Sequence, residues 1–85
     1  MYFVYFLKSL KNQHQTYVGY TTDIESRLKT HNAGGSIRTA KYRPWELMMY
    51  IAFKEVDEAR AFEAYLKTPS GKGFVLRRLL PKQRS

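Results

Sequence analysis

The stretch from residue 2 to residue 20, YFVYFLKSLKNQHQTYVGY, decides the fold. Its first part, Tyr2 to Leu7, is an unbroken run of aromatic and aliphatic residues, which is typical of a strand covered on both faces. The polar segment Ser9 to Gln15 predicts a hairpin loop, and Thr16 to Tyr20 predicts a second short strand. Within that strand, Gly19 indicates a bulge or a close backbone approach. The chain is therefore expected to begin with an antiparallel hairpin.

A helix is expected directly after the hairpin. Thr22-Asp-Ile-Glu25 fits a capping box, in which the Thr22 hydroxyl accepts an N–H group of the first turn and Glu25 reaches back to the cap. Ile24 and Leu28 lie four positions apart and form the face expected to be buried. The segment Asn32-Ala-Gly-Gly35 ends this helix.

The middle of the chain predicts a loop, a strand and a second helix. Ser36 to Pro44 reads as a basic loop, and Trp45 to Phe53 (WELMMYIAF) as the third strand. Asp57 is expected to cap a helix that runs to about Lys67. The apolar side of this helix carries Ala59, Phe62 and Leu66.

The C-terminal part predicts one more helix and a tail. Thr68 to Gly71 (TPSG) breaks the preceding helix, and a last helix is expected over about Lys72 to Leu80. The order β-β-α-β-α-α predicts an α/β (α+β) fold, with a three-stranded antiparallel sheet flanked by helices. Residues 1–81 are expected to form a single domain and residues 82–85 a basic tail.

Composition and charge favour an intracellular protein with a polyanionic partner. The chain has no cysteine, and its longest apolar stretches are far shorter than a membrane helix, so we expect a cytoplasmic location with no membrane partner. Lysine and arginine total 15 against 7 acids, which gives a net charge of +8. Nucleic acid is the expected partner, ahead of an anionic membrane surface and ahead of a merely well-hydrated basic surface.

The side chains available for chemistry are few. Without cysteine, with two histidines and with no pair of acids at metal-ligand spacing, thiolate nucleophiles, zinc sites and multi-carboxylate two-metal nucleases are excluded. Tyrosines on adjacent strands remain, together with Arg27 and His31, which lie four positions apart on one face of a helix, and an acid within the second helix, Glu63.

These residues resemble a known family. Phe3-Val4-Tyr5, then Tyr17-Val18-Gly19, Arg27 and Glu63 are similar to the motifs of the GIY-YIG nucleases, and the resemblance covers essentially the whole chain. The segments TTDIESRLKTHN, PWEL and FEAYLKTPSGKGF strengthen it. The resemblance implies the β-β-α-β-α-α fold and cleavage of phosphodiester bonds with one Mg²⁺- or Mn²⁺-type ion.

The resemblance also implies a site. Tyr5 and Tyr17 match the two motif tyrosines, of which either could prepare the attacking water, and each could instead be a core aromatic. Arg27 matches the arginine that grips the scissile phosphate, with a solvated helix charge as its plain alternative. His31 matches the next family position, where it would handle a proton or simply cap a helix end. Glu63 matches the single metal-binding acid, with an ion pair to Lys67 as its alternative.

Several positions depart from the family pattern or stand outside it. Phe3 replaces the glycine of the first motif, and no asparagine follows Asn32. Ser70 or Lys72 is expected to fill the place of the late asparagine that many relatives carry. Tyr20 is expected to pack or to contact DNA, and His14 and Trp45 are assigned to structure.

The sequence therefore predicts a divalent-metal-dependent DNA endonuclease that selects substrates by shape rather than by sequence. A non-catalytic nucleic-acid-binding module and a nuclease subunit that requires a protein partner are the alternatives. The residues expected to contact DNA phosphates are Arg38, Lys41, Arg43, Lys72, Arg77 and Arg78.

Overall fold

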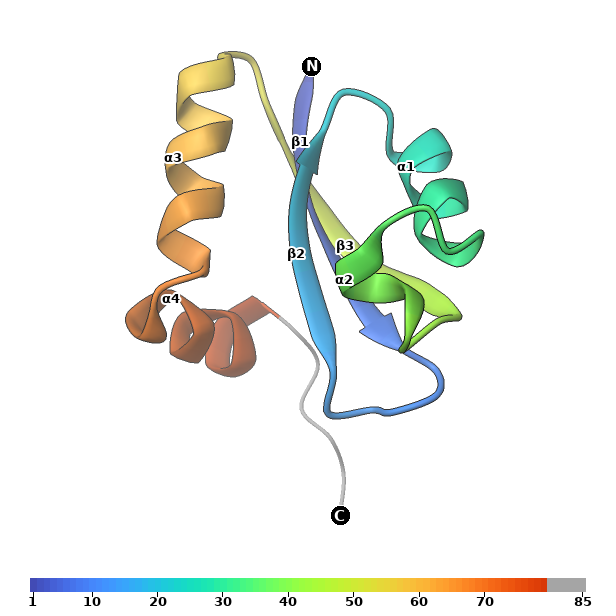
Figure 1. Ribbon diagram of the computed structural model, residues 1–85. Coiled ribbons are helices and arrows are strands. Elements are labelled where there is room, and N and C mark those ends of the chain that lie inside the picture. Colours follow the sequence, from blue (N-terminus) through green and yellow to red (C-terminus); the bar gives the residue numbers. More distant parts are fainter. Residues whose placement is uncertain (80–85) are drawn as a thin grey trace.

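Three strands and five helical segments follow one another in the computed structural model, which describes residues 1–79. The predicted β-β-α-β-α-α order is confirmed, with one short helix added in the basic loop (Figure 1). No helix within these residues has the length and apolar character needed to cross a bilayer. The elements are β1 (Tyr2–Ser9), β2 (Thr16–Thr21), α1 (Ile24–Asn32), α2 (Ile37–Ala40), β3 (Trp45–Phe53), α3 (Val56–Leu66), α4 (Pro69–Phe74) and the π-helical turn η1 (Val75–Leu79).

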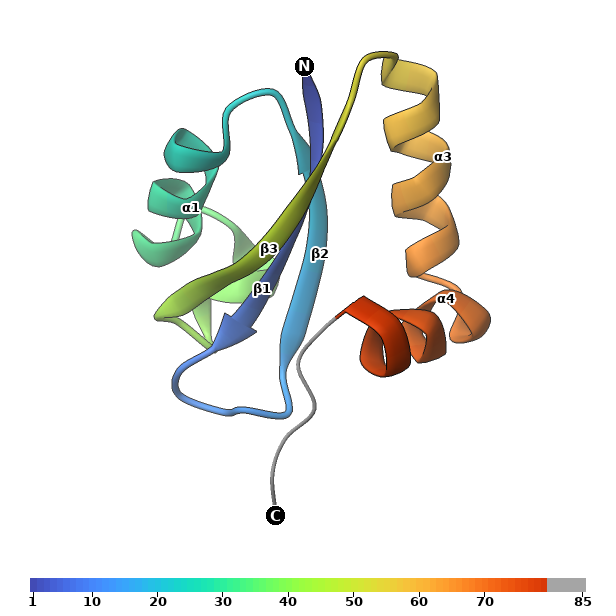
Figure 2. The same ribbon diagram turned by 180° about the vertical axis from the view of Figure 1, so that it is seen from behind.

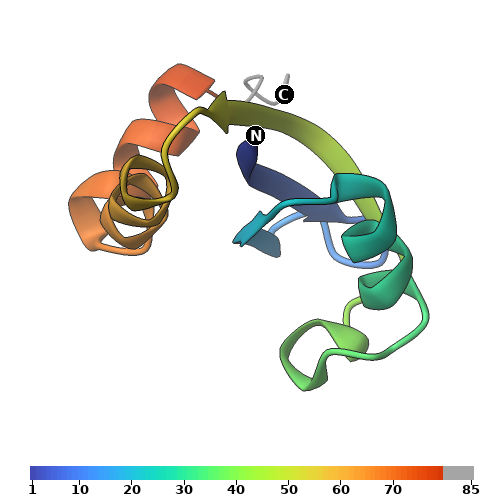
Figure 3. The same ribbon diagram turned by 90° about the horizontal axis from the view of Figure 1, so that it is seen from above.

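The sheet is fully antiparallel and has the strand order β2-β1-β3. Helices α3 and α4 lie on one side of it and α1 and α2 on the other (Figures 1 and 2). The central strand β1 is therefore covered on both faces, as its apolar run predicts, and its residues Val4 to Leu7 are all buried. Seen from above, the edge strand β2 runs between the α3/α4 layer and α2 (Figure 3).

Alternation along β1 divides the apolar side chains between two cores. Val4 and Phe6 pack with Ala59 and Leu66 in the larger core, beneath α3. Tyr5 and Leu7 point to the opposite face, where they pack with other aromatic and aliphatic side chains in a smaller core beneath α1. The expected apolar side of the second helix is confirmed, since Ala59 and Leu66 are buried and Phe62 packs against them.

A bulge in β3 lets one strand supply both cores. Phe6 pairs with Met49 and Leu7 with Leu47, so Met48 is an extra residue with no partner on β1. Met49 faces the larger core, and Leu47 faces the smaller one, although both have odd numbers. Because of the bulge at Met48, odd-numbered residues before it and odd-numbered residues after it face opposite sides of the sheet.

The helix α1 begins one residue later than expected. Asp23, not Thr22, is the N-cap: its backbone is extended, and its Oδ1 accepts the Ser26 N–H group at 3.1 Å. The predicted capping box is therefore wrong. Glu25 instead faces solvent and lies 3.8 Å from Lys29. Aspartate is as good a cap as threonine, so the residue that reaches the extended backbone conformation takes the role.

The C-terminal helices also differ from expectation at their ends. Glu55, without a side-chain hydrogen bond, occupies the cap of α3, and Asp57 lies in the first turn, where its charge favours the helix dipole. The segment Thr68 to Gly71, which was expected to break the helix, instead forms the start of α4. The Thr68 hydroxyl accepts the Gly71 N–H group, and Pro69 is at the first helical position. The last helical segment therefore begins at Pro69 rather than Lys72, and the predicted end at Leu80 and the tail 82–85 lie outside the described residues.

Candidate active site

The core of the site is formed by two tyrosines and a glycine on neighbouring strands. Tyr5 on β1 pairs with Gly19 on β2, and the Tyr5 and Tyr17 ring centroids lie 6.2 Å apart. A Cβ atom at Gly19 would collide with the hydroxyl and Cζ atom of Tyr5. The predicted bulge or close backbone approach at Gly19 is not what the structure shows: Gly19 pairs regularly with Tyr5, and it leaves the space that the Tyr5 side chain occupies.

Tyr5 and His31 are joined in the protein interior. The Tyr5 hydroxyl lies 2.9 Å from His31 Nε2, and His31 Nδ1 lies 2.7 Å from the Thr39 hydroxyl. His31 is fully buried, and its ring centroid lies 4.9 Å from that of Tyr17. Because both ring nitrogens have protein partners, His31 has no free nitrogen for a metal ion or a phosphate.

Arg27 lies at the solvent side of this cluster. It is exposed on α1, yet its guanidinium is close enough to the Tyr5 hydroxyl to lower the pKa of that phenol, against the larger effect of burial. Arg27 and His31, four positions apart, therefore meet at Tyr5, one from the surface and one from the interior. Since a guanidinium has five N–H donors, Arg27 can hold Tyr5 and retain donors for an anion.

Burial shifts the pKa values of both interior groups away from the charged form. The pKa of Tyr5 is raised, mainly because burial disfavours the phenolate, while Arg27 opposes the shift. The pKa of His31 is lowered by burial and by the positive charge of Arg27. At neutral pH, Tyr5 is therefore a protonated phenol and His31 a neutral imidazole.

Glu63 reaches the cluster from α3. Its carboxylate lies 3.1 Å from the Lys67 ammonium, which lies 5.7 Å from the centroid of the Tyr17 ring. Glu63 is also close enough to Tyr5 for its negative charge to raise the pKa of that phenol. The Glu63–Lys67 ion pair, which was the alternative role for Glu63, is therefore present. It lies next to Tyr17, a residue of the predicted site.

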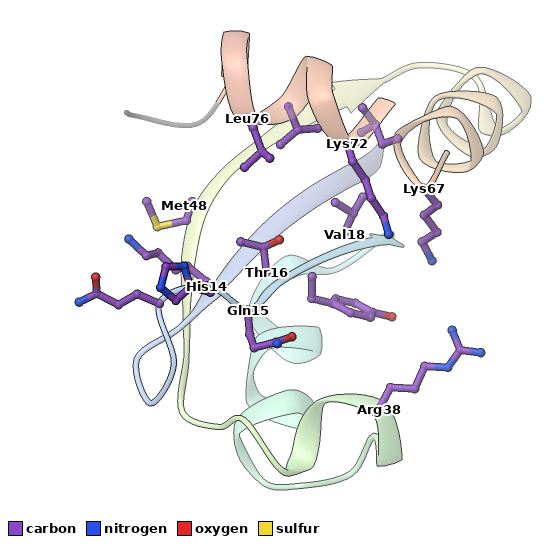
Figure 4. Close-up of a pocket in the computed structure, with 14 residues that line it drawn as sticks. His14, Gln15, Thr16, Val18, Arg38, Met48, Lys67, Lys72 and Leu76 are labelled. Carbon is purple, nitrogen blue, oxygen red and sulfur yellow. The ribbon is translucent and has the colours of Figure 1, made fainter. Parts of the chain in front are cut away.

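A groove with a volume of about 1050 Å³ opens beside Tyr17. Hydrophobic side chains such as Val18, Met48 and Leu76 lie along it, and no acid is among its lining residues. Arg38 reaches toward it from α2, and Lys67 and Lys72 reach toward it from the opposite wall (Figure 4). The groove therefore combines an apolar surface with a basic rim. Its lining consists of Lys8, Gln13, His14, Gln15, Thr16, Tyr17, Val18, Arg38, Met48, Leu66, Lys67, Lys72, Val75 and Leu76.

The predicted phosphate contacts fall into two groups. Arg38 and Lys72 border the groove, whereas Ser70, the other residue expected to fill the place of the late asparagine, is not among its lining residues. The others lie elsewhere: Lys41 lies 5.3 Å from the ring centroid of its neighbour Tyr42, Arg43 lies against Gly34, and Arg77 lies near Gly73. Arg78 is exposed on η1 and is not among the residues that line the groove.

Three further aromatic residues, Trp45, Tyr20 and His14, were assigned roles from the sequence, and the structure shows where each lies. Trp45 is buried and donates its Nε1–H to the Thr39 carbonyl at 2.9 Å, so it is structural as expected. Tyr20 stacks on Tyr2 at 6.3 Å between ring centroids and packs against the larger core. His14 is exposed in the hairpin loop, at the end of the groove that it borders with Gln15 (Figure 4).

The donor set fits a hard, hydrated cation better than zinc. Within residues 1–79 no three His, Cys, Asp or Glu side chains gather to hold an ion. Glu63 is the acid of the cluster, its side chain is 23% exposed, and its oxygens face a basic environment. One carboxylate completed by water and phosphate oxygens is an ordinary arrangement for Mg²⁺, whereas it is poor for zinc.

Two contacts of the site were not indicated by the sequence. Thr39 is a threonine within a basic segment, and nothing in the sequence indicates that it would meet a histidine eight positions earlier. Lys67 was expected only as an ion-pair partner, but it also covers the ring of Tyr17. The spacing of Glu63 and Lys67 did suggest their ion pair, whereas the contact of Lys67 with Tyr17 on β2 depends on how α3 packs.

Comparison with known proteins identifies the family to which the chain is similar. The family model described as "GIY-YIG catalytic domain" matches residues 1–76. The chain is similar to the UPF0213 proteins SpyM50708 and SPs0786 of Streptococcus pyogenes (strains Manfredo and SSI-1), with 44% identity over 52 residues in each case. Each match covers 60% of this chain and 56% of the relative, so the chain spans little more than half the length of the curated relatives it matches.

Proposed function

The chain belongs to the GIY-YIG family, whose domain is a nuclease domain, and from that premise we propose that it is a divalent-metal-dependent endonuclease that hydrolyses DNA phosphodiester bonds. The observation that carries the proposal is the convergence of Tyr5, Tyr17, Arg27 and Glu63 from four different elements and both sides of the sheet. Packing alone does not require an arginine, a glutamate and two tyrosine side chains to meet.

The structure supports different roles for the two tyrosines. Tyr17 borders the groove, whereas Tyr5 is 2% exposed and bonded to His31. We therefore assign contact with the attacking water to Tyr17 and a supporting role to Tyr5. In this assignment the Tyr17 phenolate oxygen takes one proton from water as the new O–P bond forms. The bond from phosphorus to the leaving oxygen then breaks, and that oxygen takes a proton from solvent.

The other residues provide positive charge and positioning. Arg27 presents guanidinium N–H donors to the phosphate and offsets the negative charge that develops on its oxygens. Glu63 would hold a Mg²⁺- or Mn²⁺-type ion, which supplies Lewis-acid stabilisation of the same charge and favours deprotonation of water. The Lys67 ammonium, 5.7 Å from the centroid of the Tyr17 ring, adds a positive charge beside the place where the phosphate would bind.

Substrate binding in this proposal is mainly electrostatic. Lys8, Arg38, Lys67 and Lys72 border the groove and would contact backbone phosphates without reading the bases. The proposed selectivity is therefore for DNA shape, such as a branch or flap, rather than for sequence. Neutralising about five phosphates would make log K fall with log salt at a slope of roughly −4 to −5.

The Glu63–Lys67 ion pair favours one alternative, a nucleic-acid-binding module without catalysis. A cleavage assay distinguishes the two: single-stranded, duplex and branched DNA are incubated with Mg²⁺, Mn²⁺ or a chelator. The proposal expects cleavage with metal and none with chelator. Binding with the stated salt slope, but no cleavage of any substrate with either ion, would overturn the enzyme assignment and support the binding module. Activity that requires a second protein would instead identify a subunit.

A further inference from the structure

A continuous chain of buried polar groups connects α2 with the tyrosines of the sheet. The Thr39 hydroxyl lies 3.5 Å from the Ser36 carbonyl and 2.7 Å from His31 Nδ1, and His31 Nε2 lies 2.9 Å from the Tyr5 hydroxyl. Thr39, His31 and Tyr5 are each at most 2% exposed. Because water does not reach these groups, each proton in the chain must be directed at a protein acceptor.

The direction of these hydrogen bonds follows from the donors available at each end. Tyr5 is a protonated phenol, and Arg27, the charged side chain on its solvent side, has donors only, so Arg27 cannot accept the Tyr5 proton. Among residues 1–79, His31 Nε2 is the acceptor bonded to the Tyr5 hydroxyl. Nε2 must then be unprotonated and Nδ1 protonated, with Nδ1 donating to Thr39 and the Thr39 hydroxyl donating to the Ser36 carbonyl.

We propose that Thr39 is a positioning residue of the active site, whose hydroxyl holds buried His31 in the Nδ1–H tautomer so that the Tyr5 oxygen remains free to accept a hydrogen bond from Arg27. The tautomer is an assignment from the bonding pattern, since hydrogen positions are inferred from their partners. Thr39 touches neither substrate nor metal in this view. Its effect on cleavage rests on the proposed function, whereas its effect on His31 does not.

The side chain of Thr39 can be tested separately from its backbone. Its carbonyl accepts the Trp45 Nε1–H at 2.9 Å and anchors the smaller core, and a side-chain substitution leaves that bond in place. Thr39→Val has nearly the same shape as threonine but lacks the hydroxyl. Thr39→Ser keeps the hydroxyl and is the matched control.

The direct experiment records long-range ¹H–¹⁵N correlations of the histidine rings in ¹⁵N-labelled protein at neutral pH. We expect the Nδ1–H pattern for His31 in the unmodified protein and in Thr39→Ser. We expect a mixed or Nε2–H pattern in Thr39→Val. The Arg27 side-chain Nε–H signal reports the far end of the chain, and it should exchange with water faster in Thr39→Val than in Thr39→Ser.

Cleavage provides the second readout. Thr39→Val should lower it about tenfold or more, the size expected when a supporting hydrogen-bond partner is lost, and Thr39→Ser should restore most of it. An Nε2–H pattern in the unmodified protein, or unchanged His31 and Arg27 signals in Thr39→Val, would overturn the inference. If Thr39→Val does not fold, the His31 pattern in the unmodified protein still tests the proposed Nδ1–H tautomer. If no DNA is cleaved by any variant, the proposed function fails while the spectra still decide the role of Thr39.

Discussion

The Nζ atom of Lys67 lies 3.1 Å from a carboxylate oxygen of Glu63, one helical turn away on α3. A divalent ion at Glu63 must therefore bind beside a positive charge or displace it. The two side chains are 45% and 23% exposed, so their pairing alone is worth about 0.5 kcal/mol or less. Such a weak pair does not prevent metal binding, and it stabilises the carboxylate when no ion is present.

Glu63→Gln should separate chemistry from folding and binding. Glutamine is nearly isosteric and suits a helix, but it removes the negative charge that would hold the ion. Cleavage in Mg²⁺ should nearly vanish, the free energy of unfolding should change by about 0.5 kcal/mol or less, and metal-free DNA affinity should hold or rise slightly. Glu58→Gln, at an exposed position of the same helix, is the control. Full cleavage by Glu63→Gln would leave Glu63 with only its ion pair.

Arg27→Lys should lower cleavage about 10²-fold or more, because lysine keeps the charge but not the planar set of donors that can hold Tyr5 and a phosphate together. The measurement is single-turnover cleavage at saturating metal. Lys29→Arg, on an exposed side chain of the same helix, should behave like the unmodified protein. Equal rates for Arg27→Lys and Lys29→Arg would show that Arg27 is an ordinary surface charge.

Gly19→Ala should damage the site and the fold together. The added methyl group would meet the Tyr5 hydroxyl and Cζ, so Tyr5 must move away from His31 or the strands must shift. Overpacking of this kind costs about 1–3 kcal/mol, which urea denaturation can measure. At Gly73 an added Cβ would meet the terminal atoms of Arg77, a flexible side chain, so Gly73→Ala should cost much less. Similar stabilities for the two variants would mean that the contact between Tyr5 and Gly19 is loose.

Stability should decrease as the pH falls below neutrality, because of His31. Its pKa is lowered in the folded protein, so the unfolded chain binds the proton first. The contribution of His31 to the free energy of unfolding is therefore fully present above its ordinary pKa of about 6.5. That contribution is lost as the pH falls from there toward the lowered pKa of the folded protein. The groups facing His31 are Tyr5, Tyr17 and Arg27, of which Arg27 carries the opposing charge.

Urea midpoints between pH 7.5 and pH 5 measure this dependence. His31→Gln should lower stability at pH 7.5 and flatten the decline in the acid range. His14→Gln, at an exposed position of the hairpin loop, should leave the decline as it is. A decline that persists in His31→Gln would assign it to other groups.

The strands and most helices were predictable from apolar runs, from apolar residues three or four positions apart and from the polar segments between them. Trp45 to Phe53 was predicted with its observed bounds, and the run Tyr2 to Leu7 correctly indicated a central strand. The bulge at Met48 was not predictable, since two methionines in a row do not reveal where a strand changes its inward-facing parity. The helix α2 was missed because four residues are too few for a pattern.

The sequence predicted which residues belong to the candidate site, but it did not predict the contacts between them. Tyr5, Tyr17, Arg27, His31 and Glu63 lie together, yet the burial of His31 and its bond to Thr39 depend on how α1 and α2 pack against the sheet. A single threonine between Arg38 and Ala40 has no periodic or compositional mark. The phosphate contacts were the least specific prediction, because positive charge alone does not indicate which lysines and arginines border a groove.

The turn between β3 and α3 divides the cluster along the chain. Tyr5, Tyr17, Arg27 and His31 all precede it, whereas Glu63 and Lys67 follow it. A cut at residues 54–55 would yield two fragments, one with the proposed phosphate and proton groups and the other with the proposed metal ligand. Each fragment also takes only part of the larger core, since Val4 and Phe6 would separate from Ala59 and Leu66. The two pieces should therefore complement each other, with reassociation and cleavage returning together as their concentrations rise.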